Sequence, residues 1–429
     1  MTTSTALSTS AVRRPAVRSW ACALTVVAAA CGKAPALCED GACPTGFVCN
    51  PDSGACEAGK PAPAASVGLL GRVAAVRGAD GLLGVAAFSS ERKSLIWLRE
   101  GGGDWQRNFL AGPAAAAQEA PTGLNPAAAI DSEGRPHLAW RRAGDATLWY
   151  AVQTTAGWQT EQIAIAAAGT VGSALAIGVW QGQPIVAWRA LDVQNVRVAQ
   201  KQGETWQVAT LPPPAALPGE VSPAAVDLGR SLALVVLPSG PAIAAYEATR
   251  GDLVLGARTG AVWNLARMDG VNVKTGEDGD DVGMPVAATL GPGAEIVIAY
   301  RNRTADAVML LRSKAGVSVP QRVLEGQVID STHQTIRTDL LGTALSVVVL
   351  PAGLAVVAAQ NASTLRIRIA AELPAGGFST WDLPGGVQGW PTLVVQADAT
   401  AACLWLEFTD PTRPGLGTLR RQAIPRGGE

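Results

Sequence analysis

The feature that most constrains the fold of this 429-residue chain is an internal repeat that begins near residue 67. Two units show it most clearly, at 126–164 and 173–211. Each unit has an apolar run, a glycine turn, a second run that ends in Ala-Trp, a polar turn and two further short runs. Because the runs are short, apolar and separated by turn residues, each unit predicts four β-strands.

The second run of each unit carries an anchor residue, usually aromatic, and these anchors recur roughly every 50 residues. They are Phe88, Trp140, Trp188, Tyr246, Tyr300, Ala359 and Trp405. A second tryptophan follows in five units, at Trp105, Trp158, Trp206, Trp263 and Trp381. Seven copies of such a unit predict an all-β fold, a seven-bladed β-propeller over residues 67–429. Rings of six or eight blades, a β-sandwich and a solenoid remain as alternatives.

Composition agrees with a packed domain, because 48% of the residues are hydrophobic and 16% are charged. Strands that are apolar at most positions are expected where neighbouring blades cover both faces of each sheet. The formal net charge of −1 gives no sign of a nucleic-acid partner. The chain has only two histidines, His137 and His333, which leaves little room for a His-rich metal site. We interpret His137 as structural and Cys403, in an apolar run, as a buried small side chain.

Residues 1–30 have the pattern of an export signal. Arg13, Arg14 and Arg18 precede an apolar stretch at 20–30 that is too short to span a bilayer. The small residues directly before Cys31 resemble the lipobox of bacterial lipoproteins, in which the cysteine is acylated and becomes the N-terminus. The resemblance implies a lipid anchor at Cys31, and Gly32 in place of Asp favours the outer membrane. The alternative is ordinary signal cleavage, which also exports the chain and leaves Cys31 unmodified.

Residues 31–58 contain four closely spaced cysteines, Cys38, Cys43, Cys49 and Cys56. Gly, Pro, Asn and Asp between them favour two disulfides in a loop-rich segment, for which three pairings remain open. A zinc site is the alternative, although the spacings lack a C-x₂-C pair. The segment resembles short Cys-rich modules that follow the lipobox in lipoproteins of large-genome bacteria, and residues 59–66 then form a linker.

The segment from Asp131 to Trp140 reads DSEGRPHLAW. It resembles the repeated core D-x-x-G-x-P-h-h-A-[WY] of lipoprotein propellers and of the BNR/sialidase-like class. This resemblance implies a propeller at the cell envelope. An Asp-box of the form S-x-D-x-G-x-x-W is absent from every unit, which weakens the sialidase-type assignment.

Propellers usually bind ligands on the face made by the turns between the second and third strands. Five arginines follow the anchors of three units and would meet on that face as a positive rim, which suits carboxylate or sulfate groups. The predicted ligand-binding residues are Arg141, Arg142, Arg189, Glu247, Arg301 and Arg303. The alternative is that they are solvated turn charges.

An acidic loop at 276–281 enters the fifth unit on the same face. Its carboxylates Glu277, Asp278, Asp280 and Asp281 are a candidate Ca²⁺ site. The spacing does not match an EF-hand, so a plain acidic loop that pairs with the arginines is favoured and no other cofactor is expected.

Catalytic motifs are weak in this sequence. Arg141, Arg189 and Arg301 would suit the arginine triad of a sialidase-like enzyme, but Tyr246 and Glu247 are neighbours in a strand and point to opposite faces. The sequence contains no Walker loop, G-x-S-x-G elbow or H-E-x-x-H motif. We therefore expect a non-catalytic binding or scaffolding protein of the cell envelope, with a protein or acidic glycan as its partner. The alternative is a glycan-cleaving hydrolase or lyase.

Overall fold

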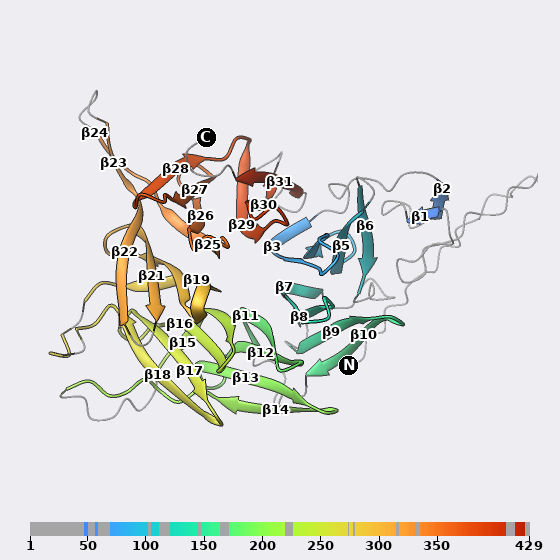
Figure 1. Cartoon of the computed structure of the whole chain (residues 1–429), viewed down its shortest axis with the longest axis horizontal. Coiled ribbons are helices and arrows are strands. Elements are labelled where there is room, and N and C mark those ends of the chain that lie inside the picture. Colours follow the sequence, from blue (N-terminus) through green and yellow to red (C-terminus); the bar gives the residue numbers. More distant parts are fainter. Residues whose placement is uncertain are drawn as a thin grey trace, which may run out of the picture.

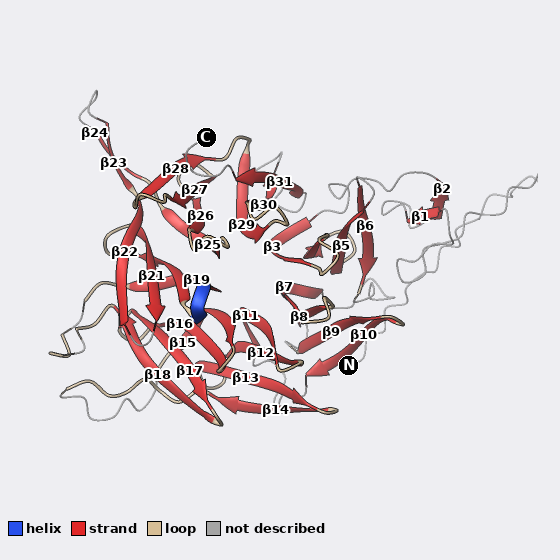
Figure 2. Ribbon diagram, in the orientation of Figure 1, coloured by secondary structure: helices blue, strands red, loops and turns tan. Residues whose placement is uncertain are grey.

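A computed structural model shows a ring of β-sheets around a central opening (Figure 1). It describes residues 47–49, 56–58 and 69–424, with gaps at 102–103, 111–120, 144–146, 164–170, 219–225, 273, 278, 315–316, 331–334 and 409–416. The described part is almost entirely strand, and the short 3₁₀ turn Pro292–Ala294 is its one helical element (Figure 2). None of its helices is long and apolar enough to cross a membrane.

The strands group into seven antiparallel blades in chain order. Blade 1 contains β3 (Leu69–Arg77), β4 (Leu83–Ser89), β5 (Ser94–Gly101) and β6 (Asp104–Phe109). Blade 2 contains β7 (Thr122–Ile130), β8 (Pro136–Arg142), β9 (Leu148–Thr154) and β10 (Gly157–Ile163). Blade 3 contains β11 (Val171–Trp180), β12 (Gln183–Ala190), β13 (Asn195–Gln202) and β14 (Thr205–Thr210).

The second half of the ring repeats this plan. Blade 4 contains β15 (Leu228–Leu237), β16 (Gly240–Glu247), β17 (Asp252–Thr259) and β18 (Val262–Asp269). Blade 5 contains β19 (Val282–Leu290), β20 (Ile296–Asn302), β21 (Ala307–Lys314) and β22 (Val317–Glu325). Blade 6 contains β25 (Leu341–Val349), β26 (Ala355–Asn361), β27 (Arg366–Glu372) and β28 (Phe378–Asp382). Blade 7 contributes three strands to the described residues, β29 (Val387–Val395), β30 (Ala401–Phe408) and β31 (Gly417–Ile424).

The first strand of every blade faces the centre of the ring, so that β3, β7, β11, β15, β19, β25 and β29 follow one another around it and β29 contacts β3. A single pair, Leu69 opposite Gly417, also links blade 1 to β31 of blade 7. The seven-bladed propeller predicted from the repeat is therefore confirmed, and the alternatives with other architectures or blade counts are not.

The predicted anchors all lie on the second strand of their blade and are buried. Trp140 packs with Trp97 of blade 1, and Trp188 packs with Tyr150 of blade 2, so each fills the wedge between two blades. The second set of tryptophans lies on the outermost strands, as the repeat predicts. Burial of an aromatic side chain stabilises a fold by roughly 1.5–3 kcal/mol, which accounts for the regular recurrence of these residues.

Two small elements lie outside the seven blades. The hairpin of β23 (Gln327–Asp330) and β24 (Thr335–Thr338) projects from the ring between blades 5 and 6 (Figure 1). In the Cys-rich segment, β1 (Phe47–Cys49) pairs with β2 (Cys56–Ala58), and the backbone register sets Cys49 opposite Cys56. The predicted signal peptide, Cys31, Cys38, Cys43 and the linker at 59–66 lie outside the described residues, so lipidation and the disulfides stay predictions.

Candidate ligand-binding site

All seven inner strands begin at the same face of the ring with a glycine as their second or third residue. These glycines are Gly71, Gly123, Gly172, Gly229, Gly283, Gly342 and Gly389. They recur at the spacing of the anchors and are a seven-fold signal in the sequence, separate from the aromatic residues of the second strands. The regular spacing of glycine marks the start of each inner strand in the sequence, and the candidate site lies beside these glycines.

The backbone at these positions explains the glycine. Gly229 has a φ of 89°, and a Cβ there would lie 2.4 Å from Cγ2 of Val196 on the preceding blade. Gly123 has a φ of 95°, and its Cβ would lie 2.4 Å from the backbone nitrogen of Leu95. Both a left-handed conformation and close approach to a neighbouring blade therefore require glycine.

The inner strands bulge directly after the glycine. The ladder between β11 and β12, for example, changes register between Val171 and Leu175, and β15 changes between Leu228 and Leu232. A bulge turns side chains away from the regular ladder. Here the turned residues lie at the mouth of the central channel.

The mouth is a cavity of about 290 Å³, close to the lower limit of roughly 300 Å³ for small-molecule pockets. Every blade contributes to its lining within two residues of the glycine, through Arg72, Asn125, Ser173, Arg230, Pro285, Thr343 and Trp390. It continues into a channel cavity of about 190 Å³, and the two cavities share Arg72, Val286, Leu345 and Pro391. A ligand at the mouth would accordingly have access to the ring centre.

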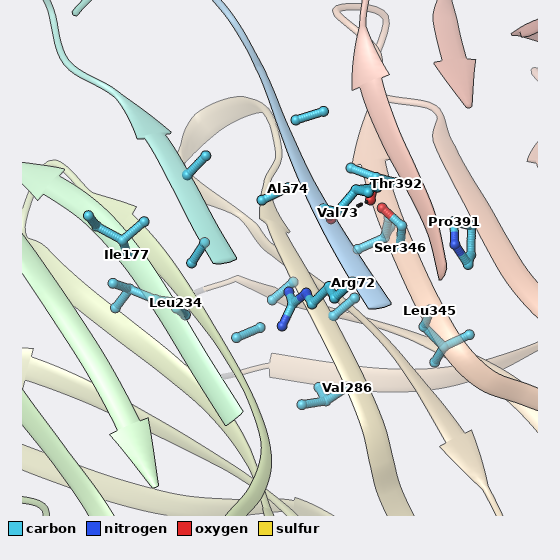
Figure 3. Close-up of a pocket in the computed structure, with 18 residues that line it drawn as sticks. Arg72, Val73, Ala74, Ile177, Leu234, Val286, Leu345, Ser346, Pro391 and Thr392 are labelled. Atoms are coloured by element: carbon cyan, nitrogen blue, oxygen red, sulfur yellow. Dashed lines mark hydrogen bonds between the residues drawn. The ribbon is translucent and has the colours of Figure 1, made fainter. Parts of the chain in front are cut away.

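The channel is lined mainly by small and aliphatic side chains, which leave its centre open (Figure 3). Alanines come from five of the seven inner strands, at Ala74, Ala75, Ala127, Ala128, Ala176, Ala233, Ala287 and Ala288. Two hydroxyl groups in the lining join neighbouring blades. Ser346 accepts a hydrogen bond from the backbone N–H of Leu393 at 2.9 Å, and Thr392 donates to the carbonyl of Val73 at 2.9 Å.

Arg72 is the one charged side chain among the 18 residues that line the channel. It extends from β3 into the space between the strands (Figure 3). Its polar contact in the described residues is to the carbonyl oxygen of Leu175 on blade 3, at 3.5 Å, which is too long for a strong hydrogen bond. The surrounding strands desolvate the guanidinium and lower its pKa from the usual value, although water reaches the side chain through the cavity.

The other polar groups of the mouth are mostly neutral. Ser231 accepts a hydrogen bond from the N–H of Val286 at 2.9 Å and keeps its own hydroxyl proton for a further partner. Ser173 and Thr343 are exposed, and Asn125 adopts a φ of 50° beside them in the lining. Trp390 is half-buried and packs edge-on against Phe408, with 6.1 Å between ring centroids.

The arginines predicted to form a positive rim lie on this face, at the turns between second and third strands. We call these turns and the adjoining strand ends the rim. Arg189 pairs with Asp227 at 2.7 Å, Arg301 with Asp306 at 3.1 Å and Arg303 with Asp281 at 2.8 Å. These three arginines are therefore neutralised by carboxylates of the same face, and their role toward a ligand stays a prediction.

Arg141 and Arg142 close strand β8 on the same face. Arg141 is half-buried, and its Nε is buried without a hydrogen-bond partner among the described residues. The backbone N–H of Arg142 donates to the carbonyl of Thr147 at 3.0 Å. Neither residue lines the cavity at the mouth or the channel.

Glu247 stabilises the turn that follows it. Its side chain is fully buried, and Oε1 accepts the backbone N–H of Thr249 at 2.6 Å. Asn302 and Asn361 hold the corresponding turns of blades 5 and 6 in the same way. Tyr246 beside it donates to Asp281 at 3.0 Å, and burial together with that carboxylate raises the pKa of Tyr246, so the phenol stays protonated. Tyr246 and Glu247, which the sequence did not predict to form a catalytic pair, are thus engaged in separate structural contacts.

The acidic loop does not gather its carboxylates in the described residues. Asp280 accepts a hydrogen bond from Asn302 at 2.7 Å, Asp281 pairs with Arg303, and Glu277 accepts from Thr275 at 3.0 Å. Asp278 lies outside the described residues. No group of three His, Cys, Asp or Glu side chains able to hold a metal ion occurs in the part of the chain that the structure describes. Asp281 of this loop pairs with an arginine of the rim, as the favoured interpretation expects, and Ca²⁺ binding by the loop stays a prediction.

His137 and Cys403 are buried, as expected for structural side chains. His137 lies between Tyr150, at 2.6 Å, and Asp131, at 3.1 Å, and desolvation lowers the pKa of its ring despite the carboxylate. This network belongs to the turn between β7 and β8, at the opposite end of the strands from the mouth. Burial likewise raises the pKa of the Cys403 thiol, so the group is a poor nucleophile.

No family model matches the chain, and no curated protein matches it. Solved structures with a similar chain path include the Aleuria aurantia lectin, described as a six-bladed β-propeller, at 15% identity and a TM-score of 0.46 over 73% of this chain and 96% of that one. An α-L-arabinofuranosidase from Fusarium graminearum has 13% identity and a TM-score of 0.45 over 70% and 92%. A protein from Lactobacillus plantarum has 10% identity and a TM-score of 0.48 over 77% and 91%. At these values the similarities carry no inference about the ligand of this chain.

Proposed function

We propose that this protein is a non-catalytic carbohydrate-binding protein that holds one sugar unit at the mouth of its central channel. The observation that carries the proposal is the composition of the mouth. Hydroxyl and amide groups come from four blades, through Asn125, Ser173, Ser231 and Thr343, and the half-buried ring of Trp390 comes from a fifth. Such groups both donate and accept hydrogen bonds, as sugar hydroxyls do, and an aromatic ring offers the apolar face that a sugar ring can cover.

The same lining argues against turnover. Among the described residues that line the mouth and the channel there is no Asp, Glu, His, Cys or Tyr. Glycoside cleavage usually requires two carboxyl groups on either side of the scissile bond, one to protonate the leaving group and one to attack or activate water. The described lining of the mouth therefore offers groups that can bind a sugar, but no carboxyl group that could act as a general acid or base.

Binding and turnover of a saccharide panel test this proposal. The purified chain is titrated with neutral and acidic oligosaccharides by calorimetry, while released reducing ends are measured in parallel. We expect saturable binding with no product. Product release, or failure of every saccharide to bind, would contradict the proposal.

A matched pair of variants locates the site. Thr343→Trp puts a large ring at the mouth, where Thr343 is exposed, and is expected to abolish binding. Val319→Trp adds the same ring on the outer strand β22, where Val319 is 71% exposed, and is expected to bind normally. Equal binding by both variants would place the sugar elsewhere.

We also propose that the chain is exported and anchored to the outer membrane by a lipid on Cys31. The small residues before Cys31 and the basic, then apolar, residues 1–30 support this. Cys31→Ser should release the protein from membrane pellets, and a variant that remains in the pellet would refute the lipid anchor.

A further inference from the structure

Arg72 differs from most arginines of this face because no carboxylate among the described residues reaches it and because it lines the channel. Within the described residues it forms no ion pair, whereas Arg189, Arg230, Arg267, Arg301, Arg303, Arg368 and Arg420 of the same face all do. Its guanidinium carries five N–H donors, and the described residues offer it a carbonyl oxygen at 3.5 Å. The side chain therefore enters the channel with most of its hydrogen-bonding capacity unused.

The surroundings make this cation a favourable partner for an anion. Alanine and other apolar side chains from all seven inner strands line the channel around it, and no carboxylate occurs among the described residues that line the channel or the mouth. Arg72 is exposed to the water of the cavity, and its N–H donors have few partners among the described residues. An anion that enters the channel would supply charge-assisted hydrogen bonds to these donors.

Arg72 also belongs to both cavities, since it lines the mouth as well as the channel. The mouth has room for one sugar unit, and the narrower channel beyond it has room for a smaller group. A substituent that projects from the sugar toward the ring axis would meet the guanidinium there.

We propose that Arg72 binds a carboxylate or sulfate substituent of the sugar held at the mouth, so that the recognised saccharides are acidic ones. This inference rests on the proposed carbohydrate-binding function. Two parallel N–H donors of a guanidinium match the two oxygens of either group, which makes the contact a charge-assisted, bidentate one.

The test compares acidic saccharides with their neutral parent. A disaccharide that ends in a uronic acid, its sulfated counterpart and the uncharged disaccharide are titrated into the purified chain and into Arg72→Gln. We expect at least one acidic form to bind about 10-fold or more tightly than the neutral one to the wild type. In Arg72→Gln the preference for the acidic forms should disappear. The uronic acid and sulfated arms distinguish which anion is bound.

Arg322→Gln is the control for the loss of one positive charge. Arg322 lies on the outer strand β22, is 51% exposed, and pairs with Glu325 at 3.4 Å. We expect it to keep the wild-type preference. Loss of the preference in this variant as well would mean that net charge, and not Arg72, selects the ligand.

A second measurement does not depend on the saccharide. Inorganic sulfate should raise the melting temperature of the wild type, relative to chloride at equal ionic strength, and should not raise it in Arg72→Gln. Without anion, Arg72→Gln should melt no lower than the wild type, because the channel loses an unpaired charge.

The outcomes separate the two proposals. Equal preference for acidic saccharides in the wild type and Arg72→Gln would overturn the role of Arg72 while the carbohydrate-binding function stands. Binding of no saccharide, together with a sulfate effect that requires Arg72, would overturn carbohydrate binding and retain the anion site. Binding of an acidic peptide, with no saccharide bound, would likewise overturn carbohydrate binding and retain the anion site.

Discussion

The rim and the channel of this propeller use arginine in opposite ways. On the rim, Arg189, Arg301 and Arg303 each lie within 3.1 Å of a carboxylate oxygen. In the channel, Arg72 has no such neighbour in the described residues. The difference teaches that a cluster of arginines on the ligand face of a propeller is a weak indication of a binding site. An arginine that lines the channel and has no carboxylate partner among the described residues, as Arg72 does, is more informative.

Position in the blade explains why the two regions differ. Rim arginines lie at turns, where strand ends of the same blade and the loop from the next blade bring carboxylates close. Asp227, for example, precedes β15 and pairs with Arg189 of β12 and with Arg230. Arg72 projects inward from β3, where its neighbours are the alanine-rich inner strands of other blades. Paired arginines should therefore matter for stability, and Arg72 for binding.

The largest effect is expected from breaking a buried rim pair. Asp252 and Arg267 are 1% and 3% exposed and lie 2.9 Å apart. Asp252→Ala would leave the Arg267 charge buried without its partner, which should lower the free energy of unfolding by about 3–5 kcal/mol. Chemical denaturation measures this. The control is Asp80→Ala, which breaks an ion pair with Arg99 that is 40% exposed on each side and should cost about 1 kcal/mol or less.

Reversing the charge of Arg72 in the channel should have the opposite pattern of effects to Asp252→Ala. It should greatly lower the affinity for the ligand and change the free energy of unfolding little. Arg72→Glu replaces an attraction by a repulsion of the bound acid group, so we expect affinity for the acidic saccharide to fall about 100-fold or more. Calorimetry gives the affinity and a thermal melt gives the stability. Arg322→Glu on β22 should bind as the wild type does, and a comparable loss in that variant would remove the distinction between rim and channel.

Lowering the pH should reduce the stability contributed by Asp131 before it changes the affinity of the channel for its ligand. Burial alone would raise the pKa of Asp131, but hydrogen bonds from His137 and Arg135 outweigh it and hold the pKa at about 2, below the usual 3.8. Because the folded-state pKa is lowered, Asp131 contributes stability above pH 3.8, and this contribution, about 2 kcal/mol, is lost as the pH falls toward 2.

Unfolding free energies measured across this pH range test the prediction. Asp131→Asn should be less stable than the wild type at pH 6, and the gap should narrow toward pH 2. A constant gap would mean that Asp131 is not ionised in the folded protein. Affinity for the sulfated saccharide should meanwhile stay flat between pH 5 and 9, because the described lining of the mouth contains no Asp, Glu, His, Cys or Tyr side chain.

The smallest effect is expected from removing a rim carboxylate, so that rim arginines lose their ion pairs as Arg72 lacks one. Asp227→Asn removes the carboxylate that neutralises Arg189 and Arg230, and Arg230 lines the mouth. Affinity for the acidic saccharide should rise several-fold at low salt, and the gain should fade at physiological salt, where exposed charges are screened over about 8 Å. Calorimetry at both salt concentrations decides this, and a gain that is independent of salt would point to a conformational cause.

The sequence predicted the architecture well and the site poorly, for a physical reason. Trp140, Trp188 and Tyr300 fill equivalent wedges between blades, so the same size and polarity recur and the repeat is visible. The residues of the mouth have no such common requirement. Arg72, Asn125, Ser173 and Trp390 occupy corresponding places and share no chemistry, so only the glycine beside each of them repeats.

The sequence also could not predict which arginines form ion pairs. Arg301 and Asp306 are close in the chain, but Arg189 meets Asp227 only because blades 3 and 4 are adjacent. Whether an arginine is neutralised depends on such contacts between blades. Glu247 illustrates the same limit, because its burial in a turn could be known only from the packing around it.

The seven glycines that open the inner strands have a consequence for how a ligand sits. A ring of seven similar blades would, if its mouth were equally regular, accept a guest in seven equivalent orientations. Here the side chains beside the glycines differ from blade to blade, apart from Arg72 and Arg230, so the symmetry of the scaffold is broken at the place where we propose that a guest is held. A sugar bound there has a single best orientation about the axis. Substitution of one residue beside one glycine should change the orientation of the bound ligand, or which ligand is bound, without disturbing the other six blades.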